Sequence, residues 1–253
     1  MSTDRLQTNV SIATDESQAR IDLAAILRWA DRQSLSEGIC NHFSLQLPDA
    51  TDQFLLNPQG LHWSEMCASD LLVVDSDGQL VKGRHNAEPS AFFIHSSVHR
   101  SRPNAKCVLH AHPPYCTALS CMQSGRLEWC SQNSLRFYGR VAYDDLYNGV
   151  AFDSAEGDRI SSMLADADVL FMANHGVLVT GENVALAFDD LYYLERAAMV
   201  QIMAMSTGRP LRIIADQVCR ETSEQIGSEC EQAYHLFEAI KRMLMRDCPE
   251  FAE

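Results

Sequence analysis

Residues 107–112 constrain the fold most, because this apolar stretch predicts a buried strand that carries two imidazoles. Side chains alternate between the two faces of a strand, so His110 and His112 are expected to share one face. His175 ends a second apolar run, before a predicted turn at Gly176. Three imidazoles with an open coordination position are typical of a catalytic metal site. A buried histidine pair satisfied by backbone carbonyls is the alternative, and the short His-x-His spacing alone favours it.

Composition limits the classes of partner. The formal net charge of -14 argues against nonspecific binding to nucleic acid or to anionic membranes. The chain has no stretch of about 18 consecutive apolar residues, as a membrane span requires. The first residues lack a secretory signal pattern, and the nine cysteines form no CxxC pair, so we expect reduced thiols and a cytoplasmic location.

The pattern of apolar residues predicts alternating helices and strands. Residues 1–14 are polar and predict a flexible arm, and residues 15–253 predict a single domain that ends in a C-terminal helix at about 221–245. Strands are expected at 43–47, 54–56, 71–74, 79–81, 107–112, 140–143, 169–173 and 177–179. Helices are expected from about 15 to 36, 91 to 99, 115 to 123, 154 to 164 and 183 to 207.

Seven short segments resemble the class II aldolase/adducin family, in the family's order and over about residues 19–207. They are Asn41-His42-Phe43-Ser44, residues 54–60, Ala68-Ser69-Asp70-Leu71, Arg102-Pro103-Asn104-Ala105, His110-Ala111-His112, Asn174-His175-Gly176 and Leu194-Glu195-Arg196. The resemblance implies an α/β fold with three layers, α/β/α, around a mainly antiparallel sheet. It also implies a homotetramer with active sites between subunits. One divalent metal ion per subunit is expected on His110, His112 and His175, with zinc favoured and manganese or iron compatible.

Departures from the family pattern bear on the reaction. The sugar-phosphate aldolases of the family carry a catalytic glutamate nineteen residues before the first metal histidine, where this chain has Ala91. Alanine cannot transfer a proton. The family's phosphate-binding serine pair is also absent, and its usual Gly-Asn reads Asn41-His42. These departures resemble the adducin-head branch and argue against cleavage of a phosphorylated sugar.

Several residues are candidates for the roles left open. His42, Glu88 and Tyr115 are the catalytic candidates, and Asn41, Gly60 and Gln132 are the substrate-binding candidates. Each has a structural alternative: His42 could hold a loop, Glu88 could be a solvated loop residue, and Tyr115 and Gln132 could lie at a rim. Tyr143 and Asp145 also lie near the motifs, and a structural role is favoured for both.

Three functions remain open at this point. The first is a metal-dependent carbon–carbon lyase, of the aldolase or decarboxylase type, for a small non-phosphorylated hydroxy- or oxo-acid. The metal would stabilise the negative charge that develops on substrate oxygens, and metal-bound water, His42 or a tyrosine would supply the proton. The second is a non-haem iron oxygenase that uses the same three histidines. The third is a non-catalytic, adducin-like interaction module, which the complete histidine set disfavours.

Overall fold

The computed structural model describes residues 14–151 and 153–253, so the predicted N-terminal arm lies almost entirely outside the described residues. Eight strands form one sheet in the order β4-β3-β2-β1-β5-β8-β7-β6. Neighbouring strands are antiparallel, except for the parallel pair β6 and β7. The strands are β1 (His42–Leu47), β2 (Ala50–Leu56), β3 (Leu72–Asp75), β4 (Leu80–Lys82), β5 (Cys107–Ala111), β6 (Val141–Asp144), β7 (Val169–Met172) and β8 (Gly176–Gly181).

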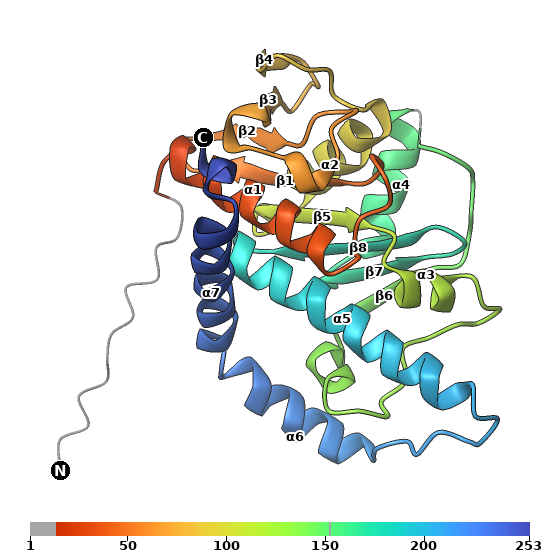
Figure 1. Ribbon diagram of the computed structural model, residues 1–253. Helices are drawn as coiled ribbons and strands as arrows, with labels where there is room; N and C mark the ends of the chain where they lie inside the picture. The colour runs from red at the N-terminus through yellow and green to blue at the C-terminus, as the bar shows by residue number, and fades with distance from the viewer. Residues whose placement is uncertain (1–13, 152) are drawn as a thin grey trace, which may run out of the picture.

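Helices cover both faces of the sheet, as Figure 1 shows. One layer contains α1 (Glu16–Arg32), α3 (Pro114–Ser120), α5 (Val184–Met205) and α7 (Glu231–Asp247). The opposite layer contains α2 (Pro89–Ser101) and α4 (Ser154–Leu164). A further helix, α6 (Asp216–Gly227), packs against the short 3-10 helix η3 (Ser134–Phe137). The predicted three-layer α/β/α fold with a mainly antiparallel sheet is therefore confirmed.

Strand alternation separates an apolar face from a face that carries polar groups. Phe43 and Leu45 of β1 enter the larger core with α1 and α5. Val108 of β5 enters a second core, which it shares with side chains of α2 and α4. His42, which alternates with Phe43, and His110, two residues after Val108, are therefore directed toward the face that α2 and α4 cover.

Three elements differ in extent from the prediction. The first helix ends at Arg32 rather than near residue 36, because Ser34 adopts a positive φ of 59°. The predicted C-terminal helix is two helices, α6 and α7, which separate after Gly227. The histidine-bearing strand ends at Ala111, so His112 lies just beyond it. Among the described residues, none of the helices combines the length and the apolar character needed to span a membrane.

Gly157 allows the close packing of α4 on α2. A Cβ atom built at Gly157 would meet the backbone carbonyl of Phe93, whereas one built at Gly227 would have no neighbour within 4 Å. We expect Gly157→Ala to lower the free energy of unfolding by about 1–3 kcal/mol, because backbone must move to relieve the overlap. The matched variant Gly227→Ala should leave this free energy unchanged or slightly raised. Urea unfolding of both variants measures the difference, and equal midpoints would contradict the packing argument.

Candidate metal centre

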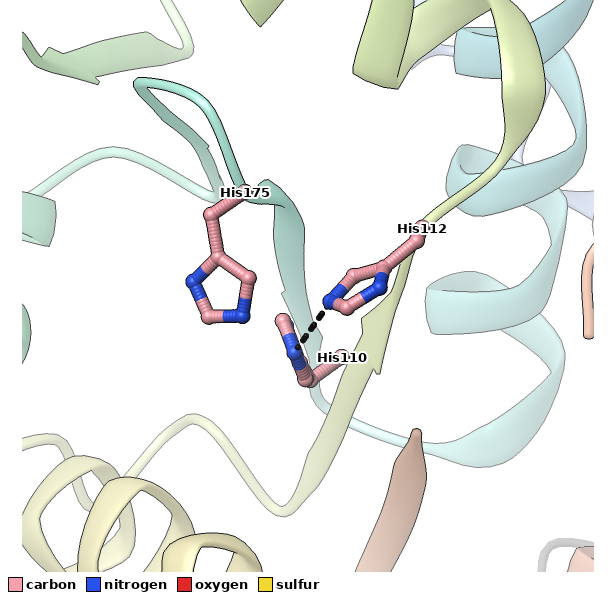
Figure 2. Close-up of side chains that lie close together, drawn as sticks. All are labelled: His110, His112 and His175. Carbon is pink, nitrogen blue, oxygen red and sulfur yellow. Dashed lines mark hydrogen bonds between the residues drawn. The ribbon is translucent and has the colours of Figure 1, made fainter. Parts of the chain in front are cut away.

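His110, His112 and His175 meet at one end of the sheet. His110 lies in β5, His112 follows that strand, and His175 lies in the turn between β7 and β8. Antiparallel pairing of β5 with β8 brings this turn against His112. The ring centroids are 5.0 Å apart for His110 and His112, and 4.8 Å from each of these to His175. Figure 2 shows the three rings around one space, so the structure brings together the three predicted ligands.

Hydrogen bonds fix one proton on each of two imidazoles. His110 Nδ1 lies 3.1 Å from the carbonyl oxygen of Val177, which can only accept. His112 Nδ1 lies 2.5 Å from Oε2 of Glu37, a carboxylate acceptor. Both Nδ1 atoms therefore donate, and the Nε2 atoms are left to face one another at 3.2 Å. A ligating histidine typically donates its second ring N–H to a carbonyl or carboxylate in this way.

The contact between the two Nε2 atoms requires positive charge between them. Two unprotonated ring nitrogens at 3.2 Å repel each other unless a proton or a metal ion lies between them. Tetrahedral zinc with Zn–N bonds of about 2.0–2.1 Å would separate two nitrogens by about 3.3–3.4 Å. A shared proton would need no third imidazole, yet a ring nitrogen of His175 lies within 4.8 Å of the ligand nitrogens of His110 and His112. The donor set therefore fits a divalent ion.

Burial keeps at least two of these imidazoles neutral. The pKa of His110 is held well below its ordinary value by burial, with smaller effects of the neighbouring histidines. Burial, reinforced by His112, lowers the pKa of His175 to about 4. Neutral imidazole is the form that coordinates a metal ion, so the pocket favours the binding-competent state.

His42 and Glu88 lie beside this group. His42 is directly opposite His110 in the pairing of β1 with β5, and their ring centroids are 4.8 Å apart. Burial lowers the pKa of His42 to about 3. Glu88 is the N-cap of α2, where its carboxylate accepts from the backbone N–H of Ala91, and its Oε2 lies 3.9 Å from His42 Nε2. Both candidates are thus near the histidines, although neither belongs to the three-histidine group.

Asn41 and Gly60 both have backbone conformations with positive φ, of 74° and 90°. The side chain of Asn41 is buried, and its Oδ1 accepts from the backbone N–H of His112 at 3.3 Å. Its Nδ2 has no hydrogen-bond partner among residues 14–151 and 153–253. A buried donor beside a ligand strand is suited to a substrate oxygen.

The remaining candidates make contacts with groups other than the three histidines. Tyr115 is in α3, where its backbone N–H donates to Glu195 and its side chain packs against the larger core. Gln132 lines a separate cavity of about 540 Å³ beside η3 and α6. Tyr143 stacks on Phe171. Asp145 forms an ion pair with Arg126. None of these four residues is brought to the three histidines by a hydrogen bond in the described structure.

Sequence reasoning missed Glu37 and a buried polar chain behind His42. The chain contains Ser44 of β1 together with His95 and His99 of α2. The spacing carried a signal, because His42 and Ser44 share a strand face and His95 and His99 share a helix face. Glu37 had no comparable signal, because it lies 75 residues before His112 in an irregular segment.

The fold of this chain is similar to those of solved class II aldolase structures. An aldolase II superfamily protein from Pseudomonas syringae is 33% identical, with a TM-score of 0.87 over 96% of this chain and 98% of that one. L-fuculose 1-phosphate aldolase from Glaciozyma antarctica has a TM-score of 0.83 over 94% of this chain and 93% of that one, and at 24% identity it supports the fold alone.

Sequence comparison adds a relative of a different kind. Rat alpha-adducin is 35% identical over 216 residues, which are 83% of this chain and 29% of the adducin. The family model for the class II aldolase and adducin N-terminal domain matches residues 21–202, which include all three histidines. The chain therefore belongs to the class II aldolase and adducin family.

Proposed function

We propose that this protein is a metal-dependent carbon–carbon lyase, of the aldolase or decarboxylase type. Its substrate would be a small non-phosphorylated hydroxy- or oxo-acid. The family contains lyases, which supports the reaction class. The observation that carries the proposal is the pair of Nε2 atoms of His110 and His112, 3.2 Å apart, with both Nδ1 protons already donated.

One divalent ion per subunit would be held by His110, His112 and His175. Zinc suits three imidazoles with an open position, and manganese or iron is compatible with the same donors. When bound, such an ion supplies Lewis-acid stabilisation of the negative charge that develops on neighbouring substrate oxygens. The protein's own part is to keep the ligands neutral and oriented, through burial and through the acceptors Val177 and Glu37.

The surroundings of His42 favour a substrate without phosphate. The carboxylate of Glu88, 3.9 Å from His42 Nε2, would repel a phosphate dianion at this position. Ala91, at the position of the family glutamate, is buried and cannot move a proton. Decarboxylation needs no base to begin, so it is compatible with this loss. The buried amide of Asn41 would then donate a hydrogen bond to a substrate oxygen.

An adducin-like interaction module is the second candidate, and the similarity to alpha-adducin favours it. The two functions differ in what the three histidines must do. A lyase needs the metal ion, whereas an interaction surface does not.

We also propose a homotetramer with sites between subunits, in the cytoplasm. Exposed apolar side chains at Leu146, Tyr147 and Val150 support an interface near the site, because the ring centroid of Tyr147 lies 6.4 Å from that of His175. All nine cysteines are free, as expected for a reducing compartment.

Removal of a ligand should remove the metal. We expect wild-type protein purified without chelators to hold about one zinc or manganese ion per chain, and His110→Ala and His175→Ala to lose most of it with the fold retained. His62→Ala, which alters an exposed imidazole outside the three-histidine group, should keep it. Elemental analysis with circular dichroism measures both effects.

The outcome also separates the candidate functions. Release of carbon dioxide or of a carbonyl product from a panel of hydroxy- and oxo-acids, lost in His175→Ala, would support the lyase. Iron with oxygen consumption would indicate an oxygenase instead. Metal-free wild-type protein would favour the interaction module. A full metal equivalent in His110→Ala would contradict the site assignment.

Glu37 should tune the affinity of the site without supplying a ligand atom. Glu37→Gln replaces a charged acceptor of the His112 N–H by a neutral one, so we expect zinc affinity to fall by about 10- to 100-fold. Glu229→Gln, at an exposed carboxylate between α6 and α7, controls for the loss of one surface charge. Competition with a zinc chelator measures both affinities, and equal values would contradict the orienting role of Glu37.

A further inference from the structure

A buried chain of hydrogen bonds runs from His42 into the α2 layer. His42 Nδ1 lies 2.8 Å from His95 Nε2, and His95 Nδ1 lies 2.5 Å from Ser44 Oγ. The same hydroxyl lies 2.7 Å from His99 Nε2. His95 and Ser44 are fully buried, His42 is 5% exposed and His99 is half-buried, so water has little access to these bonds.

The far end of the chain sets the direction of every bond in it. His99 Nδ1 lies 2.9 Å from the carbonyl oxygen of Ala105, which can only accept, so this nitrogen carries a proton. Burial lowers the pKa of His99 to about 4, so the ring is neutral and its Nε2 accepts. The Ser44 hydroxyl must therefore donate to His99, and it accepts from His95 Nδ1.

The hydrogen bond between His95 and His42 has a fixed direction for the same reason. Because His95 Nδ1 holds the proton of that neutral ring, His95 Nε2 is an acceptor, and His42 Nδ1 must donate to it. His42 Nε2 is then left as a lone pair next to His110. Its distance of 3.9 Å from Glu88 Oε2 is too long for a hydrogen bond, as expected for two acceptors.

We propose that His42 Nε2 is a fixed hydrogen-bond acceptor for a hydroxyl group of the substrate, and that His95, Ser44 and His99 hold it in this tautomer. The Oε2 atom of Glu88 already accepts from the Ser90 hydroxyl and from the backbone N–H of Ala91. His42 Nε2 and the Glu88 carboxylate are both acceptors, so they select a group that brings its own proton and disfavour an anionic oxygen. This deepens the proposed function, on which it rests, since it specifies a second hydroxyl beyond the metal-chelating atoms. His95, Ser44 and His99 are positioning residues that act through His42.

The tautomer of His42 can be measured directly. In full-length, metal-free protein labelled with nitrogen-15 histidine, long-range proton–nitrogen correlation spectra should show His42 with a protonated Nδ1 and an unprotonated Nε2. Ser44→Ala removes the link to His99, so the signals of His42 should shift toward a mixture of both tautomers. Ser96→Ala is the matched control, because the hydroxyl of this buried serine of α2 bonds, among the described residues, only the carbonyl of Phe93.

Two results would overturn the tautomer assignment. One is wild-type His42 protonated at Nε2, whether neutral or charged. The other is a His42 tautomer that Ser44→Ala leaves unchanged. The measurement needs no metal, so a failure to bind zinc would count against the proposed function alone.

The choice of ligand group is tested with lactate and glycerate, which differ by one hydroxyl. In zinc-loaded wild-type protein, calorimetry should show glycerate binding about tenfold more tightly, because only glycerate keeps a second hydroxyl for the acceptor pair when its carboxylate and first hydroxyl chelate the ion. Ser44→Ala should lose this preference and Ser96→Ala should keep it. Equal affinities of wild-type protein for the two acids would overturn the hydroxyl selection.

Discussion

The antiparallel ladder of β1, β5 and β8 is the constraint on which the site depends. The pairing of β1 with β5 sets His42 opposite His110, and the pairing of β5 with β8 sets Ala111 opposite Val177. Since side chains alternate along a strand, a slip of one residue would turn His110 into the apolar core. The same main-chain hydrogen bonds that stabilise the sheet therefore align the imidazoles.

Two backbone carbonyls also determine which ring nitrogens of the histidines carry a proton. The carbonyl of Val177 accepts from His110, and that of Ala105 accepts from His99 at the far end of the buried chain. A carbonyl oxygen cannot donate, so each one determines which nitrogen of its partner holds the proton. Burial prevents a second proton from being taken up near neutral pH. The site is thus ordered in its hydrogen atoms as well as in its heavy atoms.

The periodicity of the sequence was sufficient for much of the fold, whereas the metal-binding role of the three histidines was expected from the resemblance to the class II aldolase/adducin family. The apolar run before His110 predicted strand β5. The apolar run before His175 predicted strand β7 and the turn after it, in which His175 lies. Periodicity is local, so it could not show that Glu37 reaches His112 across 75 positions. It also could not show that Gln132 lies in another cavity, because that depends on how η3 packs against α6. The end of α1 was misplaced because Ser34 adopts a positive φ that serine rarely takes.

The partners of His110 and His112 differ in exposure, and this makes the two imidazoles respond differently to the solution. Val177 is fully buried, whereas the Glu37 side chain is 62% exposed. Dissolved ions have access to the exposed carboxylate and weaken its interaction with the His112 ring, but they do not reach a carbonyl inside the sheet. Salt therefore acts on the orientation of His112 and leaves that of His110 unchanged, which makes one of the two ring positions sensitive to the ionic medium.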